Sequence, residues 1–301
     1  MKRKVLIDTD TASDDAVALI MALRSPLVEV VAITVVAGNV PVYRGAEKPL
    51  QRELEPATWF HGLDGLGDHG YAPARRKAEA THAVAAIVAA AMEHPGLEVI
   101  TLGPLTNLAL ALHREPAIVA RISRCVVMGG AACCEGNVTP AAEFNIWVDP
   151  EAARAVFLSG LPIQMVGWEL SRHDAVLDAA DIAGLVALGT PLAEFAIACN
   201  STGAVAYEKQ TGEHGISLPD PIAMAVLLQP ELVLESSEHF VEIETASKLT
   251  RGMTVVDRLN VSDDARNELV WSEVRSRAKK ARICWKLDVA GWKKALLAAL
   301  S

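Results

Sequence analysis

The feature of this sequence that most constrains its fold is the alternation of short β-branched runs with helical segments of about ten residues. Apolar runs of strand length cover residues 4–7, 28–36, 97–102, 125–128 and 163–166, and segments with helical spacing cover 14–23, 83–92, 105–112 and 150–158. Strands that alternate with helices in this way pair in parallel, because each crossover returns the chain in the same direction. The sequence therefore predicts an α/β fold with a mainly parallel, Rossmann-like central sheet flanked by helices.

The pattern changes after Ala175 and predicts a smaller C-terminal β/α part. Helical segments at 181–188, 192–207 and 221–228 precede strand-like runs at 240–244, 253–256 and 283–287 and an amphipathic segment at 292–300. Residues 202–207 fit either the end of the second helix or the start of a mobile loop over 202–217. Since no linker, repeat or low-complexity stretch divides the chain, we expect residues 1–301 to form a single domain.

Charge and cysteine content exclude several classes of protein. Asp and Glu outnumber Lys and Arg by 37 to 28, and the sequence lacks the basic cluster of a nucleic-acid-binding protein, so we expect no nucleic-acid partner. The most apolar stretch, residues 83–92, is too short for a membrane span, so we expect no membrane partner. Five cysteines without a C-x₂-C pair predict free thiols in a reducing compartment, and hence a cytoplasmic protein.

Four carboxylates, those of Asp8, Asp10, Asp14 and Asp15, follow the first predicted strand within eight residues. In a parallel sheet this edge is where ligands bind. Four like charges repel one another unless a cation or protons neutralise them, and ligation by oxygen alone indicates a hard ion, Ca²⁺ or Mg²⁺. The alternative is an acidic turn in which Ser13 caps a helix and two acids favour its N-terminus.

Two classes of enzyme share such a cluster. Phosphatases of the haloacid-dehalogenase type open with a strand and two alternating aspartates that bind Mg²⁺. They carry Thr or Val two positions after the second aspartate, where this chain has Ala12. Their distal acidic pair follows an apolar strand, and the nearest candidate, Asp263-Asp264, lacks one. The Mg²⁺-dependent phosphatase is therefore the second hypothesis.

A co-linear series of motifs supports the other class. In order, the series comprises Ile7-Asp8-Thr9-Asp10 with Asp14-Asp15-Ala16, Gly38-Asn39, His61-Gly62, Gly103-Pro104-Leu105-Thr106-Asn107, Val127-Met128-Gly129-Gly130, residues 136–145, Asp149-Pro150-Glu151, Asp220-Pro221 and residues 249–257. The sequence resembles the inosine-uridine nucleoside hydrolase family over nearly its whole length. The resemblance implies a Ca²⁺-dependent enzyme that hydrolyses the N-glycosidic bond of ribonucleosides to ribose and free base.

The resemblance also implies roles for individual residues. It implies that Ca²⁺ is bound by Asp10, Asp15, Asp220 and the backbone carbonyl of Leu102, and that Asp10 is the general base on a Ca²⁺-bound water. The sugar would be held by Asp14, Asn39, Met128, Asn137, Glu143, Asn145 and Asp220. Carboxylates and amide oxygens suit this chemistry, because cleavage builds positive charge on the sugar. Members of the family are often homodimers or homotetramers.

Most of these residues also have a purely structural interpretation. Asn39 and Asn137 follow glycines and fit ordinary turns, and Glu143 with Asn145 fits a solvated loop. Met128, at the end of a predicted strand, fits the core. Asp149 fits a helix cap better than a catalytic role, and Asp220 before Pro221 fits an N-cap, which is compatible with metal binding.

The sequence departs from the family pattern beside the late metal ligand. Many members carry a His immediately before this aspartate, interpreted as the acid that protonates the leaving base, but here the residue is Pro219. Candidate replacements are His61, His214, Glu213 and Tyr207, and His61 is favoured because it belongs to a Gly-rich motif. Alternatively, Trp59 or Trp168 stacks on the base and eases its protonation by solvent.

A second departure is a short connection. Family members have a helix of about five turns after the Asn39 motif, whereas here Val40 runs directly into residues 41–49. This predicts either a partly uncovered sheet or two parallel strands with a very short link. Together with Pro219 it supports a third hypothesis, a catalytically inactive protein that binds a nucleoside or ribose.

Overall fold

The central sheet of the computed structural model, which describes residues 2–34, 40–72 and 77–301, is mainly parallel, as predicted. Within these residues it has eight strands in the order β3-β2-β1-β4-β5-β6-β10-β7, and each neighbouring pair is parallel except β10 with β7. The strands are β1 (Arg3–Asp8), β2 (Val28–Thr34), β3 (Val42–Tyr43), β4 (Leu97–Thr101), β5 (Ile122–Met128), β6 (Ile163–Val166), β7 (Val233–His239) and β10 (Ala281–Leu287).

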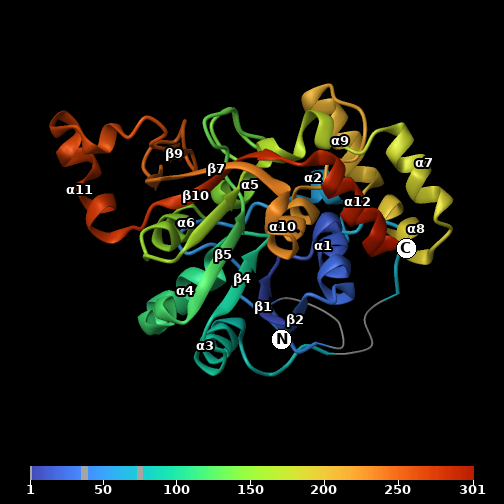
Figure 1. The fold of residues 1–301 in the computed structure, drawn as a ribbon, viewed down its shortest axis with the longest axis horizontal. Coiled ribbons are helices and arrows are strands. Elements are labelled where there is room, and N and C mark those ends of the chain that lie inside the picture. Colours follow the sequence, from blue (N-terminus) through green and yellow to red (C-terminus); the bar gives the residue numbers. More distant parts are fainter. Residues whose placement is uncertain (1, 35–39, 73–76) are drawn as a thin grey trace.

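Helices cover both faces of this sheet (Figure 1). Alternate residues of β1 belong to different apolar clusters, because successive side chains of a strand point to opposite faces: Val5 and Ile7 lie in one cluster and Leu6 in the other. One cluster contains α1 (Ser13–Arg24), α10 (Pro219–Leu228), α12 (Val289–Leu300), α7 (Ala179–Ala187) and α8 (Pro191–Cys199), and the other α3 (Ala83–Glu93), α4 (Thr106–Arg114) and α6 (Pro150–Phe157). No described helix has the length and apolar character that crossing a membrane requires.

The C-terminal residues extend the same sheet rather than forming a separate part. β10 pairs in parallel with β6, and β7 pairs antiparallel with β10. The runs near 240–244 and 253–256 form a separate antiparallel pair, β8 (Val241–Ile243) with β9 (Thr254–Val256). Neither β7, most of which is exposed, nor α11 (Glu268–Arg277), at one end of the molecule (Figure 1), was predicted from the sequence.

The predicted boundaries between residues 190 and 221 were partly wrong. The expected helix over 192–207 ends at Cys199, and α9 (Ser201–Thr211) begins after Asn200, so most of the predicted loop over 202–217 is helical. Asn200 separates the two helices, since its buried side chain donates to the carbonyl of Ala196 (3.0 Å). The remaining short helices are α2 (Thr58–His61), α5 (Phe144–Val148) and the 3₁₀ turns Pro116–Ala120, Trp168–Ser171, His173–Ala175, Pro230–Leu232, Val261–Asp263 and Ala265–Asn267.

Two predicted helix caps were also wrong. The N-cap of α10 is Leu218, with Pro219 as its first residue, so Asp220 lies in the first turn and its side chain is free for another role. The N-cap of α1 is Ala12, so Ser13 is the first helical residue and does not cap the helix.

The short connection after β2 joins two parallel strands. Of the two predicted outcomes, this is the very short link between parallel strands. β3 pairs with β2 in parallel at Ile33–Val42 and Thr34–Tyr43, and residues 35–41 link them. Residues 35–39, and with them the predicted ribose-binding Asn39, lie outside the described residues.

Charged side chains bind the C-terminus of α10, at the edge of the sheet opposite the acidic cluster. Arg124 donates to the carbonyls of Val226 (2.9 Å) and Leu227 (3.2 Å). Arg3 donates to the carbonyl of Leu228 (2.9 Å) and pairs with Glu98 (2.9 Å). These carbonyls have no partner within the helix, so the two guanidinium groups satisfy its C-terminus.

We expect Arg124→Met to destabilise the protein without changing its active site. The substitution removes the donor to the carbonyl of Val226 and one of the two donors to that of Leu227, and it removes a cation close to Glu98 (3.7 Å). The free energy of unfolding should fall by about 3 kcal/mol, measured by urea denaturation. Arg266→Met, which breaks the exposed pair with Asp264, is the control and should cost less than about 1 kcal/mol. An equal effect of the two substitutions would contradict this account.

Candidate active site

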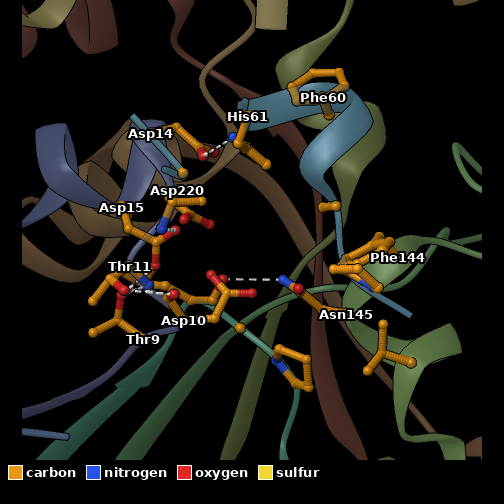
Figure 2. Close-up of a pocket in the computed structure, with 18 of the residues that line it drawn as sticks. Thr9, Asp10, Thr11, Asp14, Asp15, Phe60, His61, Phe144, Asn145 and Asp220 are labelled. Atoms are coloured by element: carbon orange, nitrogen blue, oxygen red, sulfur yellow. Dashed lines mark hydrogen bonds and ion pairs between the residues drawn. The ribbon is translucent and has the colours of Figure 1, made fainter. Parts of the chain in front are cut away.

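A pocket of about 540 Å³ lies at the carboxyl edge of the parallel strands (Figure 2). Its lining comes from the segment after β1, from α2, from the loops after β4 and β5, from α9 and from the start of α10. Figure 2 shows the labelled aspartates on one side of the pocket and Phe144 with Asn145 on the other. Its volume is in the range of pockets that enclose a small-molecule ligand.

The turn between β1 and α1 is held by the side chains it contains. Thr9 donates its hydroxyl proton to Asp15, and the backbone N–H of Ala12 donates to the other oxygen of Asp15 (3.0 Å). The N–H of Thr11 donates to the hydroxyl oxygen of Thr9 (3.1 Å), and Thr11 has a positive φ of 65°. This left-handed turn directs the chain from Asp10 back into α1, so acids from both ends of the turn reach one pocket.

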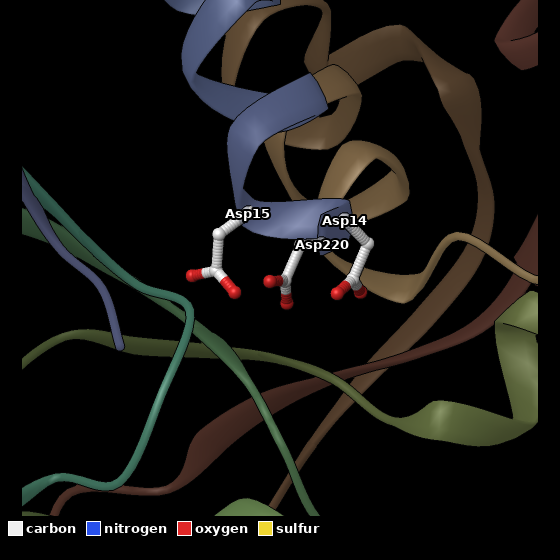
Figure 3. A group of neighbouring side chains, drawn as sticks. All are labelled: Asp14, Asp15 and Asp220. Atoms are coloured by element: carbon white, nitrogen blue, oxygen red, sulfur yellow. The ribbon is translucent and has the colours of Figure 1, made fainter. Parts of the chain in front are cut away.

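Asp14, Asp15 and Asp220 form a group whose carboxylate oxygens lie within 4.8 Å of one another (Figure 3). They come from the first turns of α1 and α10, two helices that pack together. Burial and the charges of Asp10 and Asp14 raise the pKa of Asp15 well above its usual value. Burial and the charges of Asp14, Asp15 and Asp10 do the same for Asp220.

This group fits a metal ion. Three buried carboxylates that repel one another gain most from a cation that neutralises them. Within residues 2–34, 40–72 and 77–301, no Lys or Arg forms an ion pair with any of the three, and the nearest cationic candidate is His61, 3.9 Å from Asp14. The group includes Asp14, which the sequence assigned to the sugar, and two of the predicted ligands, Asp15 and Asp220.

The other two predicted ligands, Asp10 and the carbonyl of Leu102, belong to residues that line the same pocket. The Asp10 side chain is exposed to the pocket, and the partial loss of hydration among the pocket walls, with the charge of Asp14, raises its pKa. Gly103 passes so close to Asp10 that an added Cβ would lie 3.0 Å from its side chain, which explains a glycine there. The carbonyl of Leu102 accepts a hydrogen bond from the Asn145 side chain (3.1 Å).

Asp8 also lines the pocket, but its carboxylate is engaged by neighbouring protein groups. Its buried carboxylate accepts hydrogen bonds from the hydroxyl of Thr34 and from the amide of Asn107 (2.9 Å). Burial raises the pKa of Asp8 to about 6 despite these bonds. Asp8 therefore ties the ends of β1 and β2 to the start of α4.

The predicted sugar-binding residues after β5 all line the pocket. Glu143 is buried and accepts from the N–H groups of Gly130 (2.8 Å), Asn145 (2.8 Å) and Ile146 (3.2 Å), and burial raises its pKa to about 7. Asn137 accepts from the N–H of Phe144 (2.9 Å). Glu143 and Asn145 are thus fixed and buried, and their interpretation as a solvated loop is wrong.

Met128 and Asp149 have the places that the structural interpretations predicted. Met128 is buried in the core but also lines the pocket, and its carbonyl accepts from Asn145 (3.3 Å). Asp149 caps α6, accepting from the N–H of Ala152 (3.0 Å), and also accepts from Thr106 (2.7 Å). The helix-cap interpretation of Asp149 is confirmed.

The four candidates for the leaving-group acid are placed differently. His61 lines the pocket, and its Nδ1 lies 2.9 Å from the hydroxyl of Ser13. His214 pairs with Glu208 (3.1 Å) and is absent from the pocket lining. Tyr207 donates its hydroxyl proton to Glu213, so each of these two groups is already engaged in a hydrogen bond with the other. His61 therefore keeps one ring nitrogen, Nε2, without a protein partner among the described residues.

Several pocket residues were missed by the sequence reasoning. Phe60 packs beside His61 with ring centroids 4.8 Å apart, and the side chain of Gln210 donates to the carbonyl of Asn137. Thr9 fixes Asp15 and stands inside the Asp8–Asp10 motif, so its position could have drawn attention to it. Phe60 directly precedes the His61-Gly62 motif, which could have drawn attention to it, whereas Gln210 lies in ordinary helical sequence without such a signal.

A half-buried glutamate that contacts the loop after β5 makes stability depend on pH. One carboxylate oxygen of Glu169 is fully buried without a hydrogen-bond partner, and the other accepts from the N–H of Ala132 (3.3 Å). Burial raises the pKa of Glu169 from 4.5 to about 7. The folded protein therefore favours the protonated form, and stability present below pH 4.5 is lost as the pH rises to about 7.

We expect Glu169→Gln to remove this pH dependence. Relative to the unsubstituted protein, the variant should become more stable by about 3 kcal/mol as the pH rises from 4.5 to 7.5. Urea denaturation of both proteins at several pH values measures the difference, in which the other buried carboxylates cancel. A difference that stays constant with pH would contradict the role of Glu169.

Comparison with solved structures places the fold among nucleoside hydrolases. The chain is similar to the plant nucleoside hydrolase PpNRh1 (TM-score 0.89, 28% identity, 100% of this chain and 99% of that chain). It is also similar to an inosine-guanosine nucleoside hydrolase (TM-score 0.85, 31% identity, 99% and 98% covered). The α/β fold with its mainly parallel sheet is thus the fold of these nucleoside hydrolases.

The chain belongs to the inosine-uridine preferring nucleoside hydrolase family, whose sequence profile matches residues 5–43 and 39–294. Among curated proteins it is similar to the pyrimidine-specific ribonucleoside hydrolase RihB of Escherichia coli (37% identity, 86% of this chain and 89% of the relative). It is also similar to RihA of Salmonella agona, of the same description (39% identity, 91% and 94% covered). The resemblance in the sequence is confirmed, the chain is an N-ribosyl hydrolase, and neither the phosphatase nor the inactive binding protein is supported.

Proposed function

We propose that residues 1–301 form one nucleoside hydrolase-like domain that cleaves ribonucleosides with the help of Ca²⁺. The observation that carries the proposal is the group of three buried carboxylates beside Asp10 in the 540 Å³ pocket. A continuous sheet from Arg3 to Leu287 supports a single domain. The substrate is a small-molecule nucleoside, and the products are ribose and a free base.

Ca²⁺ is the metal that the donor atoms favour. The candidate ligands are carboxylates of Asp10, Asp14, Asp15 and Asp220 and the carbonyl of Leu102, all oxygen donors, and no described His or Cys joins the group. Ca²⁺ accepts many oxygen ligands in a flexible geometry, whereas Mg²⁺ demands a stricter octahedron. When bound, the ion supplies Lewis acidity and a common anchor for hydroxyl oxygens.

The residues of the chain perform the remaining tasks. Asp10 is accessible from the pocket and takes a proton from the attacking water, since a carboxylate with a raised pKa is a better base. Glu143 and Asn145, held rigidly by backbone groups, orient the sugar hydroxyls. The carboxyl oxygens of Glu143 and the amide oxygen of Asn145 also stabilise the positive charge that develops on the sugar as the bond to the base breaks.

His61 is the group we assign to the leaving base. Ser13 is fully buried and its hydroxyl has His61 as its hydrogen-bond partner, so the hydroxyl orients the ring through Nδ1. The other nitrogen, Nε2, is then available to a base in the pocket. This assignment replaces the acid that Pro219 cannot supply, because proline has no ionisable group.

We expect His61→Asn to affect substrates according to their leaving groups. Turnover of nucleosides should fall about 100-fold, because proton donation by a positioned group contributes roughly that much. Turnover of a nitrophenyl riboside, whose phenolate leaves without a proton, should change less than about 3-fold. His214→Asn is the control and should leave both substrates unaffected. Equal losses on both substrates would remove His61 from the acid role.

The names of the curated relatives indicate which base the enzyme prefers. The relatives RihA and RihB are named pyrimidine-specific, and we infer that pyrimidine ribonucleosides are the better substrates of this chain too. We further propose a cytoplasmic enzyme of nucleoside salvage that acts as a homodimer or homotetramer. Its cysteines support a reducing compartment, since those of the structure are free thiols.

One assay tests the proposed function. Purine and pyrimidine nucleosides are incubated with the purified chain, with and without a chelator, and free ribose is measured. We expect ribose release from pyrimidine nucleosides that chelator abolishes and added Ca²⁺ restores. Phosphate release from phosphate esters in Mg²⁺, or tight nucleoside binding without hydrolysis, would instead favour the alternative hypotheses.

A further inference from the structure

Arg172 occupies the centre of a charged cluster behind one wall of the pocket. One of its Nη atoms donates to Glu213 (2.7 Å) and the other to Glu135. Only 14% of the Arg172 side chain is exposed, and 21% of that of Glu213. The pair with Glu213 is therefore mostly removed from solvent, and such a pair holds a fixed geometry far better than an exposed one, whereas Glu135 is exposed.

The cluster joins three segments that are distant in the sequence and all line the pocket. Glu135 belongs to the loop after β5, Arg172 to the segment after β6, and Glu213 to the link between α9 and α10. The backbone N–H of His173 also donates to Glu213 (3.1 Å). Arg172 therefore fixes the distances between three walls of the pocket with one side chain.

Two aromatic residues of the pocket depend on this cluster. The guanidinium of Arg172 lies over the ring of Trp168, 4.8 Å from its centroid, and the indole N–H donates to the carbonyl of Glu135 (2.8 Å). Tyr207 donates its hydroxyl proton to Glu213. Trp168 and Tyr207 are both buried and both line the pocket.

The aromatic and the carboxylate side chains of the pocket lining suit different parts of a nucleoside. Oxygen-rich side chains suit the hydroxyls of the sugar, whereas the flat, largely apolar base needs aromatic surfaces. If the aspartates bind the sugar, the base lies against the aromatic part of the lining. This step rests on the proposed function.

We propose that Arg172 is a positioning residue that fixes the two aromatic side chains, Trp168 and Tyr207, against which the leaving base lies. Burial opposes ionisation of Glu213, but hydrogen bonds from Tyr207 and the N–H of His173, with Arg172 beside it, hold the pKa of Glu213 below its usual value. Glu213 is therefore an anion that keeps the hydroxyl proton of Tyr207. Tyr207 serves the base as a wall, and its proton is not available to the leaving group.

The test separates binding of the base from binding of the sugar. Arg172→Met removes the ion pairs but keeps much of the apolar chain, and Arg172→Lys keeps the charge without the planar fork. For each variant, KM and kcat are measured with a pyrimidine and a purine nucleoside, together with the inhibition constant of free ribose. The matched control is Arg258→Met, which removes a similar stack on Trp285 (4.4 Å), a residue that is not in the pocket lining.

We expect Arg172→Met to raise the KM of nucleosides about tenfold and to alter the ratio between the two nucleosides, with ribose inhibition unchanged. Arg172→Lys should recover part of the loss, and Arg258→Met should resemble the unsubstituted enzyme. The double variant R172M/E213Q guards against misfolding, because it leaves no unpaired Glu213, and its KM should match that of R172M. Parallel changes in KM and ribose inhibition, or no change in KM, would overturn the proposal. If the unsubstituted enzyme releases no ribose, the proposed function fails instead.

Discussion

Asp10→Asn should reduce kcat at least 1,000-fold while leaving the fold intact, roughly the contribution of a general base. Asn has nearly the shape of Asp, so the close contact with Gly103 is preserved. The amide cannot accept a proton from water at neutral pH. Ribose release under saturating substrate measures kcat, and circular dichroism verifies the fold.

The KM of the same variant tests whether Asp10 is also needed for substrate binding. Asp10→Asn also removes one of the charges that repel Asp15 and Asp220, so it should not disrupt the carboxylate group. Nucleoside should therefore still bind, and KM should change far less than kcat. Asp264→Asn, an isosteric change in an exposed pair with Arg266, is the control and should leave kcat unchanged. A variant that retains kcat within about tenfold removes Asp10 from the role of base.

The sequence predicted the parallel sheet because its strands are buried on both faces. Such strands contain continuous apolar runs, as in the last four residues of β5, which are all buried, and these runs are visible without a structure. β7 lacked that signal because its residues are mostly exposed and its partner β10 lies far along the chain. The break at Asn200 was missed because it depends on a hydrogen bond of one buried side chain rather than on a helix-breaking residue.

The candidate site was predicted where its residues follow a strand directly. The carboxyl ends of β1, β4 and β5 meet at one edge, so acids and amides after them had to converge. Asp220 is different: it reaches the cluster because α10 packs on α1, and only the resemblance to a family indicated its place. Arg172 could not be predicted at all, since its importance comes from two glutamates and a tryptophan in three separate segments.

Removal of the metal should cost both activity and stability. Without an ion, the raised pKa values of Asp15 and Asp220 mean that the cluster holds protons that binding of Ca²⁺ must displace. We therefore expect Ca²⁺ affinity to rise with pH and protons to be released on binding. Calorimetry in two buffers of different ionisation enthalpy measures the number released. Chelation should lower ribose release more than 1,000-fold and lower the melting temperature by several degrees.

Asp220→Asn distinguishes a metal site from a merely acidic pocket, because it should move stability in opposite directions with and without Ca²⁺. In the presence of chelator the variant loses one of the mutually repelling carboxylates, so it should be at least as stable as the unsubstituted protein. Added Ca²⁺ should stabilise the variant little, because a charged ligand has been replaced by a neutral one, so in Ca²⁺ the variant should be less stable than the unsubstituted protein. The Kd for Ca²⁺ should rise about 100-fold. Asp264→Asn should behave as the unsubstituted protein in both conditions. If Asp220→Asn is destabilised equally with and without Ca²⁺, Asp220 has a structural role in α10 and the carboxylate group is not the metal site. That outcome would leave the roles of Asp10 and His61 to be tested separately, because neither depends on a contact with Asp220.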